Sequence, residues 1–236
     1  MRLRIGRTSL AKAGNRRDEN EDAIAFSLAR RRFAVSDGAT ASSFSREWSS
    51  AIASWYVHGK SDGSIAAGIK PIQHRWAQAL EGRDWPWYVA EKALQGAFAT
   101  LVGLTIRSDR TWEAVAVGDS CLFQTRDGRT TSFPLSKAEE FSSRPLLIGS
   151  RAEWNDKLDR WTRRASGTIR AGDELILATD AIAALLVART VEDDEIPAVT
   201  LHLHGSSAER RARLSALRRS GALKNDDLSL LHIRVE

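Results

Sequence analysis

The sequence predicts an α+β layered sandwich in which antiparallel sheets pack on one another and helices lie outside. Short β-type segments stand at both ends of the chain, around helical blocks. Several of them, such as residues 175–178, are apolar at every position and must therefore be covered on two sides. The 236 residues are 42% hydrophobic and 28% charged and show no linker, so we expect one domain over residues 1–236.

The first half of the chain contains three short strands and then a helical block. The strands are expected at residues 3–5, 23–28 and 33–36. Apolar residues between positions 44 and 55 recur three and four apart, which predicts a helix that Ser42 or Ser43 can cap. A second helix is expected over 65–80, cut by Pro71, and a third begins at Pro86 and runs to Leu101.

The second half of the chain is richer in strands. We expect strands at residues 112–117, 121–124, 162–169, 174–179 and 228–235. Asp127-Gly128 is a hairpin turn signal, and residues 132–156 are irregular. Helices are expected at roughly 180–189 and 206–220, the latter capped by Ser206 or Ser207.

Acidic residues stand at the ends of these strands. Asp37, Asp119 and Asp180 each follow an apolar β segment, and the pairs Glu21-Asp22 and Asp226-Asp227 precede two others. Taken singly, each acid opens a turn or caps a helix. If they converged on one side of a sandwich, their carboxylates would repel one another and need cations among them. Ligand sets made only of oxygen select hard cations such as Mg²⁺ or Mn²⁺.

Two nearby residues extend the hypothesis from metal binding to phosphate chemistry. Arg17, four residues before Glu21, can grip a phosphate through two parallel hydrogen bonds; the alternative is a surface ion pair within residues 16–19. Gly38 lets the backbone approach closely and offers its carbonyl to a metal. Paired divalent ions lower the pKa of a shared water and stabilise in-line displacement at phosphorus.

With these motifs in this order, the chain resembles the metal-dependent protein phosphatases, the type 2C serine/threonine phosphatases, in a compact bacterial-type form. The resemblance spans nearly the whole chain, and its landmarks are residues 17–23, 33–38, 117–120, 178–180 and 226–229. It implies a four-layer α-β-β-α sandwich with two mainly antiparallel sheets and a metal centre at one end of them.

The resemblance also implies a role for each metal ligand. Asp37 would bridge two Mn²⁺ or Mg²⁺ ions, and Gly38 would contribute its carbonyl. Glu21 would support one ion, directly or through water, while Asp180 and Asp226 would hold the other. A hydroxide bridging the two ions would then attack the phosphate without forming a covalent phosphoenzyme.

Further roles and one departure follow from the same resemblance. Arg17 would bind the substrate phosphate, Asp119 would help to hold a third, weaker ion, and Asp22 would orient the other ligands. The family usually has His or Met where this chain has Ala39, which cannot donate a proton. Protonation of the leaving group would then fall to a metal-held water or to Thr40, at a cost in rate. The irregular stretch 132–156 is short, so we expect a reduced substrate-contacting flap.

The leading hypothesis is a cytoplasmic hydrolase that removes phosphate from phosphoserine or phosphothreonine of a protein, such as a kinase or its substrate. The apolar stretches are too short to cross a bilayer, and the N-terminus lacks the apolar run of a secretory signal. The alternative is a weakly active or inactive phosphatase-like module that binds a phosphorylated partner or a kinase. Ala39 and an exposed patch at Trp85 and Trp87 favour that alternative.

The net charge of +5 comes from one stripe, residues 209–224, because the rest of the chain sums to zero. Such a stripe is usually a solvated helix face, and otherwise it binds an acidic partner or nucleic acid. No aromatic residue lies among its arginines, which disfavours binding of single-stranded nucleic acid. Nucleic acid is therefore not an expected partner.

Overall fold

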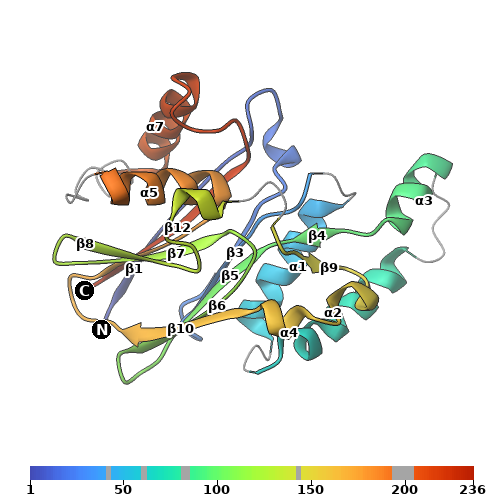
Figure 1. Cartoon of the computed structure of the whole chain (residues 1–236), viewed down its shortest axis with the longest axis horizontal. Coiled ribbons are helices and arrows are strands. Elements are labelled where there is room, and N and C mark those ends of the chain that lie inside the picture. The colour runs from blue at the N-terminus through green and yellow to red at the C-terminus, as the bar shows by residue number, and fades with distance from the viewer. Residues whose placement is uncertain (41–43, 60–62, 81–85, 142–144, 193–204) are drawn as a thin grey trace.

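Two five-stranded antiparallel sheets lie face to face with helices outside them, as Figure 1 shows. The computed structural model describes residues 1–40, 44–59, 63–80, 86–141, 145–192 and 205–236. The layered α+β sandwich predicted from the sequence is confirmed.

The first sheet is built from strands at both ends of the chain and from its middle. Its members are β1 (Leu3–Leu10), β7 (Cys121–Arg126), β8 (Arg129–Phe133), β11 (Glu174–Ala178) and β12 (Leu228–Val235). They run in the order β1-β12-β11-β7-β8, and every neighbouring pair is antiparallel. The predicted hairpin joins β7 to β8, where Asp127 and Gly128 both have positive φ, as a tight primed turn requires.

The second sheet has the order β10-β6-β5-β3-β2, again with antiparallel neighbours. Its strands are β2 (Ala23–Ser27), β3 (Arg32–Ser36), β5 (Leu101–Ile106), β6 (Thr111–Val117) and β10 (Arg163–Thr168). A separate two-stranded ribbon pairs β4 (Phe98–Ala99) with β9 (Ile148–Gly149).

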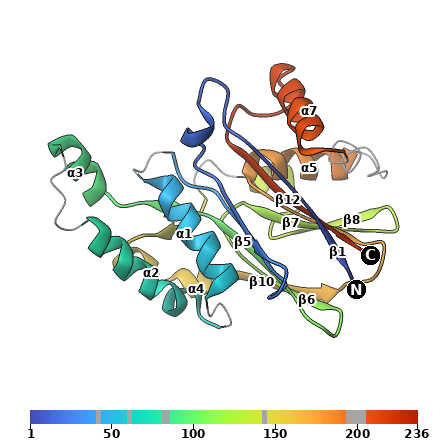
Figure 2. The ribbon, with the colours of Figure 1, turned by 180° about the vertical axis from the view of Figure 1, so that it is seen from behind.

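The helices cover the two outer faces, as Figures 1 and 2 show. On the side of the second sheet lie α1 (Ser45–His58), α2 (Ile65–Leu80) and α4 (Leu158–Trp161), whereas α3 (Trp87–Leu94) projects away from both sheets. Those on the side of the first sheet are α5 (Asp180–Glu192) and α7 (Ser207–Arg219). Three short 3₁₀ turns complete the described elements: η1 (Arg17–Glu19), η2 (Ala138–Glu140) and η3 (Ala152–Asn155).

The sandwich contains three apolar layers. Between the sheets lie side chains such as Phe33, Leu177 and Ile233, all buried. A second layer, with Trp48 and Ile69, fills the space between the second sheet and helices α1 and α2. The third, with buried Ala, Ile, Leu and Val side chains of α5, lies between that helix, α7 and the first sheet. Both sheets are thus covered on two sides, which explains the fully apolar strands of the sequence.

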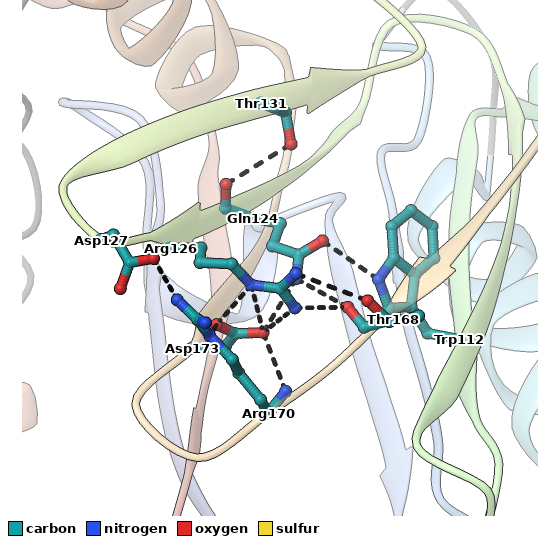
Figure 3. A network of polar contacts seen from close by, with 8 residues as sticks. All are labelled: Trp112, Gln124, Arg126, Asp127, Thr131, Thr168, Arg170 and Asp173. Carbon is teal, nitrogen blue, oxygen red and sulfur yellow. Dashed lines mark hydrogen bonds and ion pairs between the residues drawn. The ribbon is translucent and has the colours of Figure 1, made fainter.

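A polar network stabilises the end of the sandwich at which β11 begins (Figure 3). The side chain of Asp173 is 1% exposed and accepts hydrogen bonds from Arg126, from Gln124 at 3.0 Å and from the amide of Arg170 at 3.0 Å. Burial raises the pKa of this carboxyl, but its hydrogen bonds outweigh burial and lower the pKa overall. The network joins β7 to the β10–β11 connection.

Three details of the predicted helices were wrong or fall outside the described residues. Helix α2 runs through Pro71 without interruption, because buried Ile69 and Ile72 hold it on both sides of the proline. The third helix ends at Leu94 rather than continuing to residue 101, because Gly96 adopts a positive φ of 66°. The proposed cap at residues 42–43 lies outside the described residues.

Candidate metal centre

Antiparallel register brings the acid-bearing strand ends to one edge of each sheet. In the second sheet Ala23 lies opposite Ser36, so Asp22 and Asp37 are neighbours. In the first sheet Ala178 pairs with both Cys121 and Leu230, so the segment that follows β11 meets the segments that precede β7 and β12. Thr179 then links the two sheets, because its hydroxyl donates a hydrogen bond of 3.0 Å to Asp22.

The clustering of the acids is visible in their electrostatics. Burial, followed by repulsion from Asp22, Asp180, Asp119 and Asp226, raises the pKa of Asp37 well above its usual value. Burial and then the charges of neighbouring aspartates also raise the pKa of Asp22 strongly. Burial and the nearby Asp180 raise the pKa of Asp119 to about 7. Aspartates from five separate segments therefore lie close enough to influence one another at one end of the sandwich.

Two of these carboxylates each have an oxygen without a protein partner. Asp22 Oδ1 and Asp119 Oδ1 are buried and accept no hydrogen bond from any described residue. A buried carboxylate oxygen without a donor is costly, and a cation would relieve that cost. The all-oxygen donor set and these two atoms fit a hard divalent ion.

Asp180 and Asp226 form the more open side of the centre. In each carboxylate one oxygen accepts a backbone N–H: Ala181 donates to Asp180 Oδ1 at 2.6 Å, and Asp227 donates to Asp226 Oδ1 at 3.0 Å. The second oxygens both face Lys224, whose Nζ is 3.3 Å from Asp180 Oδ2 and 2.7 Å from Asp226 Oδ2. In the part of the chain that the structure describes, no three acidic, histidine or cysteine side chains form a ready-made set of metal ligands.

Glu21 lies at the rim of the cluster and is fixed through its backbone. Its amide donates to Asp227 Oδ2 at 2.8 Å, while the amide of Lys12 donates to Asp227 Oδ1 at 2.8 Å. Burial raises the pKa of Glu21, and a hydrogen bond with Thr40 opposes this rise. Thr40, which the sequence suggested as a proton donor, is thus brought next to Glu21.

The backbone at Gly38 leaves no room for a side chain. A Cβ there would stand 2.7 Å from the carbonyl oxygen of Ser45 and 2.8 Å from that of Glu21. The preceding residue, Asp37, is fixed through its backbone. Its amide donates to Thr100 Oγ1 at 3.0 Å, and its carbonyl accepts from the Thr100 amide at 2.8 Å. Glycine is therefore required by packing, independently of any role of its carbonyl.

Arg17 is the one predicted site residue for which the structure shows no link to the cluster. It is exposed at the start of η1, and no hydrogen bond or ion pair of its side chain is found among the described residues. The alternative of a surface ion pair is also not observed for Arg17, since Arg16 is the residue that pairs with Asp18. Its role in binding phosphate stays a prediction.

Sequence reasoning missed four residues that support the centre: Asp227, Thr179, Thr100 and Lys224. Asp227 and Thr179 adjoin predicted ligands, so the doubled acid and the Thr-Asp pair were usable signals. Lys224 was counted in the basic stripe, and no sequence signal marked Thr100, which hydrogen-bonds Ser120 as well as Asp37.

The basic stripe at 209–224 is not a uniform solvated face. Arg210 is 7% exposed and donates to Thr8, Gly205 and Arg7. Arg218 donates to the backbone carbonyls of Ala11 and Asp226. With Lys224 in the acidic cluster, half of the six positive charges are directed towards the body of the protein, which further disfavours nucleic acid as a partner. Of the suggested tryptophan patch, Trp87 is exposed and residue 85 lies outside the described residues.

A four-layer sandwich with aspartates gathered at one end of both sheets is the architecture expected of metal-dependent phosphatases. The sequence model of protein phosphatase 2C matches residues 12–217, so the chain belongs to the protein phosphatase 2C family. The predicted family is confirmed, and the chain therefore belongs to a class of protein phosphatases. No curated protein sequence matches the chain.

Solved structures share the fold at low sequence identity. The serine/threonine phosphatase PstP/Ppp of Mycobacterium tuberculosis is 18% identical, with a TM-score of 0.63 and coverage of 99% of both chains. The PstP catalytic domain in complex with two manganese ions is 17% identical, with the same TM-score and coverage. PppA, a regulatory component of T6SS in Pseudomonas aeruginosa, is 18% identical, with a TM-score of 0.58 and coverage of 99% of this chain and 98% of its own.

Proposed function

We propose that this protein is a metal-dependent phosphatase acting on phosphoserine or phosphothreonine of a protein. The observation that carries the proposal is the convergence of aspartates at one end of the sandwich, where Asp22 lies beside Asp37, Thr179 hydrogen-bonds Asp22 across the two sheets, and Lys224 spans Asp180 and Asp226. Such a cluster is stable with all its members ionised only when cations lie among them. Membership of the protein phosphatase 2C family supports the same chemistry.

The expected ions are two Mn²⁺ or Mg²⁺, with Asp119 near a third, and the manganese complex of the PstP catalytic domain supports this expectation. Glu21, Asp37, the carbonyl of Gly38, Asp180 and Asp226 would hold the pair. When bound, the ions would activate a water molecule and neutralise charge on the phosphoryl group. Because no ready-made ligand set exists among the described residues, some of these side chains must turn to bind them.

The remaining residues would bind the substrate and manage its proton. The exposed guanidinium of Arg17 is available to hold a phosphate through two parallel hydrogen bonds. Ala39 offers no proton for the leaving group, and the Thr40 hydroxyl already hydrogen-bonds Glu21. We therefore expect a low turnover number in comparison with phosphatases that carry a proton donor at this position.

The test is hydrolysis of p-nitrophenyl phosphate and of a phosphoserine peptide by the purified protein, with and without Mn²⁺. Asp37→Asn and Asp180→Asn should each lower metal-dependent kcat by at least about 100-fold, whereas Asp156→Asn, at an exposed position, should not. Phosphate release that needs no metal, or full activity in both variants, would contradict the proposal.

Substrate and location belong to the same proposal. We expect a cytoplasmic protein whose substrate is a kinase or a kinase substrate. Among the helices described, none combines the length and the apolar character that a membrane span requires.

A second candidate is a phosphatase-like module that binds a phosphorylated partner without turning it over. Ala39 and the engagement of Asp180 and Asp226 by Lys224 favour it. Calorimetry separates the two functions, because tight binding of a phosphopeptide without uptake of Mn²⁺ would support the binding module.

A further inference from the structure

Lys224 occupies a position that its charge alone does not explain. It comes from the loop between α7 and β12, and its side chain is 65% exposed, so it could extend into water. Instead its Nζ lies 2.7 Å from Asp226 Oδ2 and 3.3 Å from Asp180 Oδ2. The ammonium group therefore spans two carboxylates that belong to different strand ends.

Among the described residues, the oxygens that Lys224 contacts are the ones that accept no backbone N–H. Oδ1 of Asp180 and Oδ1 of Asp226 each accept an amide N–H, at 2.6 Å and 3.0 Å. Oδ2 of each carboxylate is the more open oxygen, and Lys224 lies against both of these atoms. A divalent ion that bound the two carboxylates through Oδ2 would contact the same two atoms as Lys224.

The charges on the neighbouring residues show why a cation belongs there. Asp119 and Asp37 both sense Asp180 and Asp226 as repulsive, and Asp119 senses Lys224 as attractive. Lys224 is thus a positive charge placed within a cluster that would otherwise repel itself.

We infer that Lys224 is an internal counter-cation of the acidic centre, which neutralises Asp180 and Asp226 in the metal-free protein and competes with a divalent ion for their free oxygens. This inference rests on the proposed function, because it takes these two residues as metal ligands. It makes Lys224 a positioning residue that sets the affinity for metal.

The experiment compares Mn²⁺ binding by wild type, Lys224→Met, Lys224→Arg and Lys157→Met, using calorimetry on the full-length protein with Mn²⁺ alone. Lys157 is an exposed lysine on the helical side of the second sheet and serves as the matched control. We expect Lys224→Met to bind Mn²⁺ about twofold to fivefold more tightly, because it removes an exposed cation that competes for both carboxylates. Lys224→Arg, which keeps the charge, and Lys157→Met should stay close to wild type.

Thermal unfolding supplies a second measurement that a purely structural role would not reproduce. In EDTA, Lys224→Met should melt about 2–4 °C below wild type, because its carboxylates lose their counter-ion. In saturating Mn²⁺ that difference should vanish or reverse. An equal loss of Tm in EDTA and in Mn²⁺ would mean that Lys224 only contributes packing, and would overturn the inference.

The remaining outcomes separate this inference from the proposed function. If wild type and Lys224→Met bind Mn²⁺ with equal affinity and both hydrolyse p-nitrophenyl phosphate, only the role of Lys224 is wrong. If neither protein takes up Mn²⁺, both the inference and the proposed function fail.

Discussion

Replacement of Asp119 by asparagine should change how the stability of the metal-free protein depends on pH. Asp119 is 6% exposed, one of its oxygens has no partner among the described residues, and burial with the repulsion of Asp180 raises its pKa to about 7. Asparagine has nearly the same shape and carries no charge. The variant Asp119→Asn therefore removes the ionisation and leaves most of the packing unchanged.

The size and sign of the effect follow from the two pKa values of Asp119. In the unfolded chain the carboxyl has its ordinary pKa of 3.8, and in the folded protein about 7. Between these values the folded protein holds a proton that the unfolded chain has released, so stability falls as pH rises. Each pH unit is worth about 1.4 kcal/mol, which limits the loss from Asp119 to about 4 kcal/mol between pH 4 and pH 7. We expect about 2–4 kcal/mol, because neighbouring charges readjust.

The assay is urea unfolding in EDTA at half-unit steps from pH 4.5 to pH 8.5. The free energy of unfolding of Asp119→Asn should gain on that of wild type as pH rises, and the difference should become constant above about pH 7. Asp37 and Asp22 also have raised pKa values, but both proteins contain them, so they largely cancel in the difference. Asp156→Asn, at an exposed site, should parallel wild type. A difference between Asp119→Asn and wild type that does not change with pH would refute the reasoning.

Three further changes test the supports of the site and the fold. Gly38→Ala places a Cβ 2.7–2.8 Å from backbone oxygens and should lower the free energy of unfolding by about 2–3 kcal/mol, measured by urea denaturation; unchanged stability would contradict the close approach. Asp227→Asn cannot accept both amide hydrogen bonds, so the free energy of unfolding should fall by about 2 kcal/mol. Its affinity for Mn²⁺, measured by calorimetry, should fall as well. An affinity equal to that of wild type would argue that Asp227 does not position Glu21. Asp173→Asn leaves Arg126 without its buried partner and should lower Tm in a melting experiment, from a loss of about 3 kcal/mol, without changing Mn²⁺ binding; a change in Mn²⁺ binding would link the two ends of the sandwich.

Much of the fold could be predicted because local patterns and tertiary packing agree. The apolar strands of the second half appear within one or two residues of their expected ranges, as at β12 (Leu228–Val235). The prediction of a helix break at Pro71 failed because burial of the flanking isoleucines outweighs one lost hydrogen bond. The prediction of a longer third helix was wrong because the helical spacing of apolar residues continues past Gly96 into a buried strand.

The acidic residues of the candidate site could be predicted, because they stand at the ends of the strands. Asp37, Asp119 and Asp180 follow strands whose register then brings them together. Lys224 lies two residues before Asp226, so its contact with that carboxylate had a local signal, but its contact with Asp180 arises only from the fold. The burial of Arg210 was not predictable, because nothing local distinguishes it from the other arginines of the stripe.

The order of the motifs, the alternation of strands with helices and the choice of oxygen ligands were determined by the sequence alone, since each depends on residues adjacent in the chain. Only the tertiary structure decided how the charges are paired. It places one lysine between two aspartates, buries one arginine without a carboxylate partner among the described residues, and leaves the exposed side chain of Arg17 without a hydrogen bond or ion pair to those residues. Electrostatic interaction depends on distance through space, and residues more than 200 positions apart become neighbours only when both sheets have formed.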